Sequence, residues 1–314
     1  MAKGDMIATR EAYGKALVSL AEEYKDLVVL DADLSGSTKT AAFAEKYPER
    51  FFEMGIAEQD MLGTAAGLAA AGKKPFASTF AIFASGRAWE QVRNSIAYAQ
   101  FNVKIAATHA GVTVGEDGAS HQAIEDIALM RVIPGMTVVI PADAVETEQA
   151  VKALLEYDGP AYLRLGRSKV PVVMDDDYQF QLGKAATMRE GDAVTIIACG
   201  IMVDAALTAA EELAGEGISA RVLNMSTIKP LDEEAVLKAA KETRAIVTCE
   251  EHSIIGGLGS AVAECVVKSY PVPMRFVGVK DRFGQSGSPA ELVKEYGLTA
   301  GDIVRAVKEV LAAK

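Results

Sequence analysis

The stretch LVVLDADLSGSTKTAAFAEKYPERFFEMGIAEQDMLGTAAGLAAAGKKPFAST (residues 27–79) contains a strand pattern, a helix pattern and a second strand pattern in succession. The apolar runs at 27–33 and 74–79 have the short length of buried strands, whereas the run from Met61 to Ala71 has the length of a helix. Two strands joined by a crossover helix lie parallel in one sheet. The stretch therefore predicts the start of a parallel α/β sheet.

The same alternation continues on both sides of this stretch. Further strands are predicted at 103–109, 137–142 and 161–165, and helices at 10–24, 88–100, 121–133 and 144–157. After an aspartate-rich segment of little periodicity, strands are predicted at 193–200, 220–227, 244–251 and 274–279. Between and after these strands we expect four helices: one that ends at Leu213, one over 233–243, one that follows a glycine-rich turn, and one that begins at Ala300. We expect an α/β protein of two domains, each a mostly parallel sheet flanked by helices: 1–172 and 191–314, joined by a linker at 173–190.

Charge and composition exclude several classes of protein. The chain of 314 residues has 32 Lys and Arg against 43 Asp and Glu, a net charge of −11, which disfavours nucleic acid and anionic membranes as partners. The polar N-terminus does not read as a signal peptide, and no apolar run reaches the length of a membrane span. Cys199, Cys249 and Cys265 lie in apolar surroundings without a CxxC pair, so we expect reduced, buried thiols in a cytoplasmic protein and no metal site.

Glu58 begins the helical pattern of the opening stretch. An acid in the first turn of a helix is favoured by the helix dipole, and that role alone could account for Glu58 and Asp60. The small residues that follow, AAGLAAAG, allow another backbone to approach closely, including that of a second subunit.

The segment THAGVTVGEDGASHQ (108–122) holds two of the three histidines, His109 and His121, with Asp117 between them. Imidazoles and acids on a glycine-rich loop are a better candidate for a site than for a core, although GEDG could also be a plain turn. The spacing is weak evidence for a metal site. His252, at the start of a second glycine-rich loop, is ambiguous.

Two further groups follow predicted strand ends, where open α/β sheets bind ligands. Phe80 and Phe83 could be core residues or could stack on a flat heteroaromatic ring. Arg164 and Arg167 could form surface ion pairs or bind a phosphate. The sequence IIGGLGSAV lacks the spacing of a nucleotide-binding glycine loop, which disfavours a nucleotide.

Together these segments resemble the transketolase family of thiamine-diphosphate enzymes. The resemblance is carried by GIAEQ (55–59), STFAIF (78–83), ATHAGVTVGEDGASHQAIED (107–126), PGMTVVIPAD (134–143) and EEHSIIGGLGSAVAE (250–264). It covers only the back half of a full transketolase, because the GDG motif with a downstream Asn, which in this family holds Mg²⁺ and the cofactor diphosphate, is absent. The resemblance implies a pyrimidine-binding domain followed by a transketolase C-terminal domain without direct chemistry.

The resemblance also assigns roles to particular residues. Glu58 matches the glutamate that hydrogen-bonds N1′ of the aminopyrimidine; we expect it in apolar surroundings, where a carboxyl group readily shares its proton with a ring nitrogen and so favours the reactive imino form. Phe80 and Phe83 match aromatics around that ring, and Gly86 stands where a third aromatic is common. His109, Asp117 and His121 match residues along the sugar path, with the histidines also able to assist proton transfer. Arg167 matches a phosphate-binding Arg, with Arg164 as the alternative; Ser37 matches a phosphate-contacting Ser and Asp33 a residue near the cofactor.

The implied enzyme is a split transketolase of the pentose phosphate type (EC 2.2.1.1). This chain would pair with a separate N-terminal subunit that binds Mg²⁺, in an α₂β₂ assembly that contains a homodimer of this chain. It would transfer a two-carbon ketol group between sugar phosphates. Three alternatives stay open: a 2-oxo acid dehydrogenase β chain, a synthase of the deoxyxylulose-phosphate type, and a non-catalytic scaffold subunit.

Overall fold

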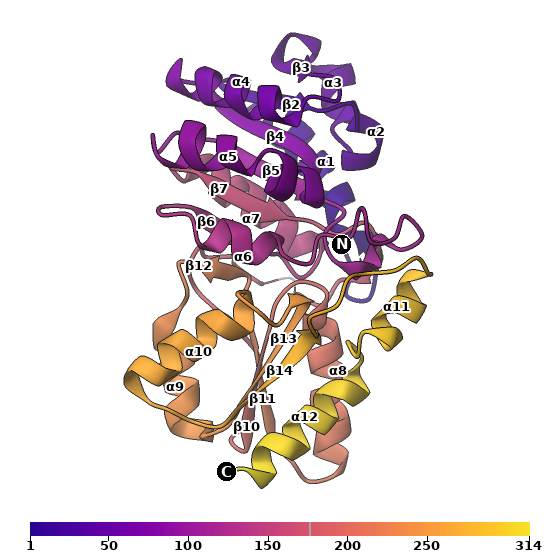
Figure 1. Ribbon diagram of the computed structural model, residues 1–314, viewed down its shortest axis with the longest axis vertical. Helices are drawn as coiled ribbons and strands as arrows, with labels where there is room; N and C mark the ends of the chain where they lie inside the picture. The colour runs from indigo at the N-terminus through magenta and orange to yellow at the C-terminus, as the bar shows by residue number, and fades with distance from the viewer. Residues whose placement is uncertain (176) are drawn as a thin grey trace.

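The computed structural model describes residues 1–175 and 177–314 and places two α/β domains end to end along its longest axis (Figure 1). The first domain contains a seven-stranded sheet in the order β12-β6-β7-β5-β4-β2-β3, whose edge strand β12 (Thr227–Lys229) is contributed by the second half of the chain; all neighbouring strands except β12 and β6 run parallel. The strands are β2 (Leu27–Asp31), β3 (Phe51–Glu53), β4 (Lys74–Phe80), β5 (Lys104–Thr108), β6 (Thr137–Val139) and β7 (Ala161–Arg164). The predicted parallel sheet is confirmed.

Helices cover both faces of this sheet. Successive strand residues point to opposite faces, and the residues on each face are apolar, so each face needs a cover. Val29 and Phe76 pack with α1 (Thr9–Leu20), α3 (Ala41–Lys46) and α7 (Ala144–Glu156). Leu30 and Ala77 pack on the other side with α4 (Glu58–Ala70) and α6 (Asp126–Arg131). This part of the chain also contains α2 (Ser35–Thr38), α5 (Trp89–Gln91), the 3₁₀ turns η1 (Pro48–Arg50) and η4 (Val112–Val114), the π-helical turns η2 (Phe83–Arg87) and η3 (Val92–Ala97), and a small antiparallel pair of β1 (Met6–Ala8) and β8 (Lys169–Pro171).

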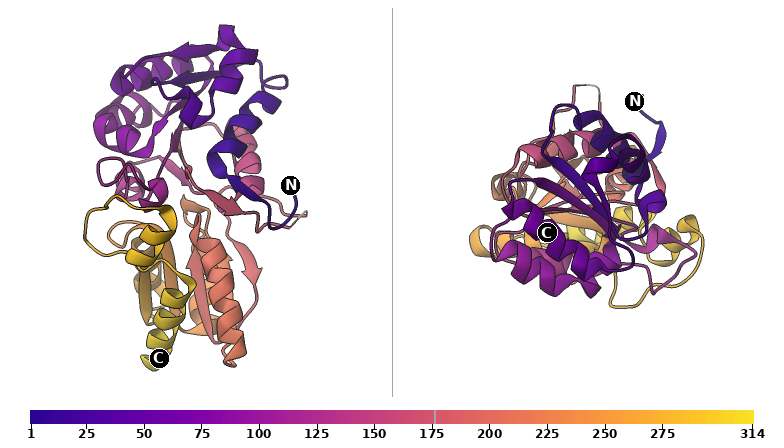
Figure 2. Two further views of the ribbon diagram at one scale, coloured as in Figure 1. Left: turned by 90° about the vertical axis from the view of Figure 1, so that its right-hand side faces the viewer. Right: turned by 90° about the horizontal axis from the view of Figure 1, so that it is seen from above.

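The second domain is a smaller sheet in the order β14-β13-β10-β11-β9, with the antiparallel strand β9 at one edge. Its apolar strand residues also alternate: Ile196 packs with α8 and α12, and Ile197 packs with α9 and α10. The elements are β9 (Ala186–Arg189), β10 (Val194–Ala198), α8 (Met202–Gly215), β11 (Ala220–Asn224), β12 (Thr227–Lys229), α9 (Glu233–Thr243), β13 (Ile246–Ser253), α10 (Leu258–Ser269), β14 (Met274–Val279), α11 (Pro289–Glu295) and α12 (Ala300–Ala312). The side view shows the two sheets one above the other (Figure 2).

Several predicted elements differ from the structure. The expected helix 88–100 is only α5 followed by the π-helical η3 (Val92–Ala97), and the expected helix 121–133 begins at Asp126. The later start follows from the backbone of residues 118–123, which forms turns and a bridge between Ala123 and Ala110. Within the expected linker, of which residue 176 lies outside the described residues, β9 joins the second sheet. The domain boundaries themselves stay a prediction.

Burial and exposure bear on two further expectations. All three cysteines are free thiols in buried positions, as predicted. None of the helices in the described part of the chain combines the length and the apolar character that crossing a bilayer requires.

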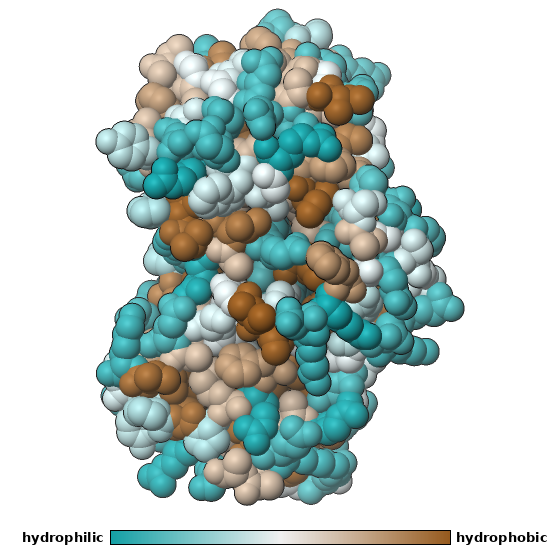
Figure 3. Space-filling model, viewed as in Figure 1, coloured by the Kyte–Doolittle hydropathy of each residue, from teal (hydrophilic) through white to brown (hydrophobic). Residues whose placement is uncertain are grey.

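Some large apolar side chains remain at the surface. They gather in separate groups on the face that carries α4, α5, α6 and α10, including the level where the domains meet (Figure 3). The exposed large apolar side chains include Ile56 at 76%, Tyr98 at 88%, Val132 at 68%, Ile255 at 61% and Phe283 at 81%.

Candidate active site

An aromatic cluster of Phe80, Phe83, His109 and His121 lies at the carboxyl ends of β4 and β5. Phe80 ends β4 and His109 directly follows β5, and these two parallel strands are neighbours, which brings both side chains to one edge of the sheet. The Phe80 ring stacks on Phe83 with centroids 5.8 Å apart and on His109 at 3.8 Å. His121 meets both phenyl rings edge-on, at 6.3 and 5.6 Å. Four residues that the sequence singled out therefore form one cluster.

His109 is held in one tautomer. The Arg10 guanidinium can only donate, so its Nη1 donates to Nε2 of His109 at 3.4 Å, and Nδ1 of His109 carries the proton that it donates to Thr108 Oγ1 at 2.9 Å. Burial, followed by the charges of Arg10 and Arg167, lowers the pKa of His109 to about 3. Its backbone φ of +57° is unusual for a residue with a side chain and occurs where surrounding structure enforces it. His109 is thus a fixed, neutral hydrogen-bonding group.

We expect the His109 imidazole to show no titration between pH 8 and pH 5 in NMR spectra of the folded protein. The unfolded chain takes up a proton near the ordinary pKa of 6.5 and the folded chain does not. His109 therefore lowers the free energy of unfolding as the pH falls from 6.5 towards 3, by up to about 1.4 kcal/mol per pH unit. Urea unfolding at pH 7 and pH 5 should show a smaller pH effect in His109→Gln than in the wild type. A His109 ring that titrates near pH 6.5 would contradict this geometry.

Two arginines place positive charge beside the aromatic cluster. Arg10, in the first turn of α1, donates from Nη1 to the Ser37 carbonyl at 2.8 Å, while its buried Nε has no partner among the described residues. Arg167 donates to the Val114 carbonyl and to Glu116 at 2.9 Å. Burial lowers the pKa of Arg10, and the charge of Arg167 acts in the same direction to a smaller extent. This basic pair is suited to an anion.

Arg10 is the residue that the sequence analysis missed. A signal for it existed: the first turn of a helix favours acids because of its dipole, and a basic residue there needs another reason. Arg10 occupies that position in α1, and among the described residues no acid lies at ion-pair distance from its guanidinium.

Arg164, the alternative phosphate-binding residue, is excluded by its surroundings. It is 6% exposed, and its Nε donates to Asp126 Oδ2 at 2.8 Å while its Nη2 donates to Asp126 Oδ1 at 3.2 Å and to the Glu251 carbonyl at 2.9 Å. Asp126 also accepts from Tyr162 at 2.8 Å. Arg164 thus belongs to a buried network between the domains and has no free face for a ligand.

Glu58 is the first residue of α4 and is 2% exposed, yet it does not lie in apolar surroundings as the sequence suggested. Arg87 Nη1 donates to both carboxylate oxygens, at 2.8 and 2.9 Å, and its guanidinium lies over the Phe83 ring at 4.4 Å. Arg87 reaches this place from the π-helical turn η2 (Phe83–Arg87). A cavity of about 610 Å³ opens here, lined by Glu58, Arg87 and residues 56, 57, 59, 60, 63 and 91.

The remaining candidates lie at the rim of these groups. Asp33 and Asp117 are exposed, Ser37 is half-buried, and neither aspartate belongs to the contacts described above. A side chain at Gly86 would enter open space, and the guanidinium of Arg87 covers the adjacent Phe83 ring instead of a third aromatic. Among the described residues, no group of three or more His, Cys, Asp or Glu is arranged to hold a metal ion.

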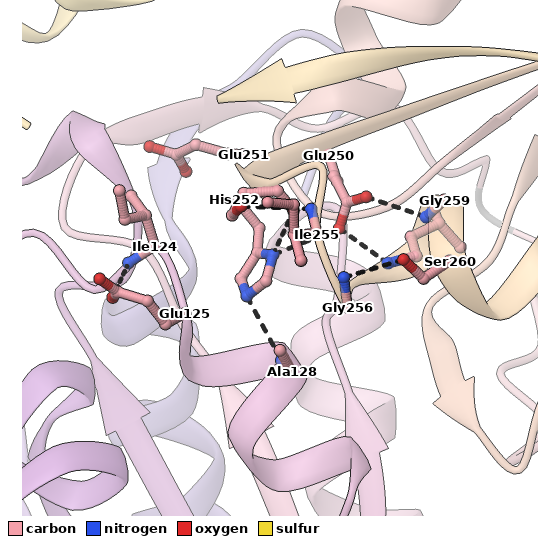
Figure 4. Close-up of polar contacts among 12 residues, drawn as sticks. Ile124, Glu125, Ala128, Glu250, Glu251, His252, Ile255, Gly256, Gly259 and Ser260 are labelled. Carbon is pink, nitrogen blue, oxygen red and sulfur yellow. Dashed lines mark hydrogen bonds and ion pairs between the residues drawn. The ribbon is translucent and has the colours of Figure 1, made fainter. Parts of the chain in front are cut away.

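The glycine-rich loop of the second domain is occupied by its own side chains (Figure 4). Glu250 accepts from the backbone N–H groups of Leu258 and Gly259, at 2.7 and 2.9 Å, and so fills the N-terminus of α10 that would otherwise attract an anion. His252 is fully buried and its Nε2 accepts from Ala128 N–H at 3.3 Å, across the domain junction. This loop is therefore structural.

Comparison with known proteins matches the chain to one family over both domains. Residues 5–173 match the family model of the transketolase pyrimidine-binding domain, and residues 183–303 match that of the transketolase C-terminal domain. A 6-deoxy-6-sulfo-D-fructose transketolase subunit of Clostridium sp. is 48% identical over 97% of this chain and 95% of its own length. An apulose-4-phosphate transketolase subunit of Phocaeicola vulgatus is 45% identical over 97% of this chain and 98% of its own.

A solved structure is similar over the same range. It is described as a split-gene transketolase in an inactive β4 tetramer, and it is 58% identical with a TM-score of 0.92 over 98% of this chain and 99% of that one. Its similarity extends through both domains and the junction between them. The chain belongs to the transketolase family, with a pyrimidine-binding domain followed by a C-terminal domain.

Proposed function

We propose that this chain is the C-terminal subunit of a two-polypeptide transketolase that transfers a two-carbon ketol group between sugars bearing an anionic terminal group. The observation that carries the proposal is the assembly of Glu58, the aromatic cluster and the basic pair along one edge of one domain. The relatives named as transketolase subunits have nearly the same length as this chain, which supports a split enzyme.

The residues around Glu58 fit the aminopyrimidine of thiamine diphosphate. Arg87 already holds a flat, cationic, nitrogen-bearing group between the Phe83 ring and the Glu58 carboxylate. Its guanidinium stands in for the edge of the aminopyrimidine, which has a similar plane and would make its own hydrogen bond to the acid. Arg87 is about half exposed, at 47%, so it can turn outward without leaving a buried cation.

Thiamine diphosphate, when bound, supplies the carbon nucleophile that attacks a sugar carbonyl. Glu58 would hold a proton against the pyrimidine nitrogen, and Phe80 and Phe83 would pack against the ring and exclude water. Asp33, exposed in the turn that follows β2, is assigned to the outer side of the cofactor. Mg²⁺ and the diphosphate are assigned to the N-terminal subunit.

The basic pair supplies the binding site for the substrate anion. We assign the terminal phosphate or sulfonate to Arg10 and Arg167, with Ser37 beside them, because a fork of N–H donors matches such an anion. His109 donates or accepts hydrogen bonds only, since its pKa of about 3 keeps it neutral. Asp117 and His121 are assigned to sugar hydroxyls, and His121 is the histidine left for proton transfer.

The face that carries α4 is the proposed subunit interface. A side chain at Gly63 or Gly67 would meet nothing within 4 Å, so no described part of this chain packs there. Exposed Ile56 and Tyr98 lie on neighbouring segments. We assign this face to contact with a second copy of this chain within an α₂β₂ enzyme. The surrounding surface is assigned to the N-terminal subunit, and the assembled enzyme to the cytoplasm.

Replacing Arg87 by alanine should tighten the binding of thiamine diphosphate to the complete enzyme by about 10-fold, because the cofactor would no longer displace an ion pair and a cation–π contact. Titration calorimetry in the presence of Mg²⁺ measures this. The control is Arg93→Ala, which replaces an exposed arginine in η3 and should leave the affinity unchanged. Weaker binding in Arg87→Ala would mean that Arg87 contacts the cofactor rather than competing with it.

The proposed function is tested by reconstitution. The purified chain is mixed with a candidate N-terminal subunit, thiamine diphosphate and Mg²⁺, and assayed with ketose and aldose phosphates, with a sulfo-sugar, and with pyruvate. We expect ketol transfer with an anionic sugar from the mixture and none from the isolated chain. Turnover by the isolated chain would contradict the split enzyme. Activity on pyruvate but not on sugars would instead identify a 2-oxo acid dehydrogenase or deoxyxylulose-phosphate-type subunit.

A further inference from the structure

The second domain reaches the proposed site through the segment between β14 and α11. This lead-in segment (281–288) runs beside the 111–122 loop, which carries Asp117 and His121 (Figures 1 and 2). Helix α11, which follows the segment, packs on η4 in that loop. The loop proposed to contact sugar is therefore covered by a different domain from the one that bears it.

Gln122 joins the loop to the lead-in segment. Its side chain is 2% exposed, and its Nε2 lies within hydrogen-bond distance of the carbonyls of Val112 at 3.1 Å, Gly115 at 3.3 Å and Gln285 at 2.9 Å, which share its two N–H groups. One amide thus ties both arms of the loop to the second domain. Gln122 directly follows His121 in the chain, so the backbone that its amide anchors is the backbone that carries His121.

Glycines on both sides permit this close approach. A Cβ on Gly284 would overlap Oε1 of Gln122, and a Cβ on Gly118 would lie 2.5 Å from Ser286 Oγ. A Cβ on Gly115 would lie 3.3 Å from both Arg167 Nη1 and Pro289 Cδ. The loop backbone therefore fits between the lead-in segment and Arg167 with no room for a side chain.

The lead-in segment is itself fixed to α11. Tyr296 donates to the Phe283 carbonyl at 2.8 Å, and Arg282 pairs with Glu295 at 2.9 Å. Ser288 closes a capping box with Glu291 at the start of the helix. On the other side, buried Glu251 accepts from Thr113 N–H at 2.6 Å and holds the first arm of the loop.

We propose that the C-terminal domain sets the position of the substrate loop, with Gln122 and Gly284 as positioning residues for the anionic sugar. The role of these residues in binding sugar rests on the proposed function, whereas the control of the loop position by the C-terminal domain does not. Loss of this contact should displace Asp117, His121 and Arg167 together and leave Glu58 and Phe83 in place.

The first test uses Gly284→Ala in the full-length chain, with hydrogen exchange as the readout. Exchange of the amides of residues 113–122 should rise about 10-fold while that of α4 stays unchanged, because only the loop loses its support. Gly215→Ala is the matched control, since a Cβ there would meet nothing within 4 Å. Unchanged loop exchange in Gly284→Ala would overturn the proposal, whether or not the protein is a transketolase.

Gln122→Ala provides a second variant that adds no atoms, so it remains informative if Gly284→Ala folds poorly. It should raise loop exchange in the same way. In the double variant, Gly284→Ala should raise loop exchange little beyond the level of Gln122→Ala, because the Gln122 amide that the new methyl group would collide with is absent. Additive effects of the two substitutions would overturn the pairing of these residues.

In the reconstituted enzyme, both variants should raise the KM for the anionic sugar by about 10-fold or more, with a smaller change in kcat and an unchanged affinity for thiamine diphosphate. A parallel loss of cofactor affinity would indicate a general structural defect and would overturn the positioning role.

Discussion

Glu58→Gln should lower the kcat of the reconstituted two-subunit enzyme by about 10²–10⁴-fold, the range that a positioned proton-holding group contributes. Glutamine keeps the shape of the side chain, but its amide cannot share a proton with a ring nitrogen. The structure gives this acid a buried place beside Phe83, where a flat group is already accommodated. Steady-state assays at saturating cofactor measure the loss.

Asp60→Asn is the matched control for Glu58→Gln. Asp60 lies in the same first turn of α4 but is exposed. If Glu58 served only the helix dipole, the two substitutions would have similar effects, about 0.3–1 kcal/mol on the free energy of unfolding and none on turnover. Wild-type turnover in a correctly assembled Glu58→Gln enzyme would favour the non-catalytic scaffold.

Arg164→Leu should lower the free energy of unfolding by about 3–5 kcal/mol, because it leaves Asp126 buried and without its cation. Asp126 is fully buried, and the hydroxyl of Tyr162 would be its main remaining side-chain partner. The guanidinium also binds the Glu251 carbonyl of the second domain, so its loss should loosen the contact between the domains. Urea unfolding of the isolated chain measures the effect without a partner subunit.

The exposed pair Lys3–Asp175 provides the comparison for this prediction. Its side chains are 64% and 67% exposed, and Lys3→Ala should cost about 0–1 kcal/mol. A cost below about 1 kcal/mol for Arg164→Leu would show that water enters the junction and stabilises Asp126 there.

Much of the fold was predictable because most of its elements are local patterns. Strand β14 and helix α9 have the bounds that the sequence indicated. Strand β12 could not be found in this way, since it adds to the sheet of the other domain at β6 and depends on the domain junction. The π-helical turns were also missed, because apolar spacing in a short segment does not distinguish them from an α-helix.

The site was predictable where a residue type is unusual for its place. Two histidines on a glycine-rich loop and two phenylalanines at a strand end were singled out separately, and only the structure shows that these four residues lie together in the aromatic cluster. The partners of charged groups were not predictable: Glu58 and Arg87 are 29 positions apart, and Arg164 and Asp126 are 38 apart. Such pairs form through tertiary packing, which a single sequence does not show. Arg10 differs in part: its place in the first turn of a helix was a signal in the sequence, whereas its contact with His109 depends on tertiary packing.

The carboxylate of Glu250 at the N-terminus of α10 has a practical consequence for inhibitor discovery. Because that acid already satisfies the free amides, a phosphate-bearing fragment would have to expel a buried, hydrogen-bonded side chain to bind there. Screening campaigns aimed at this family member should therefore expect few hits from nucleotide mimics in the C-terminal half. Chemical effort is better directed at flat cationic heterocycles that displace the Arg87 side chain.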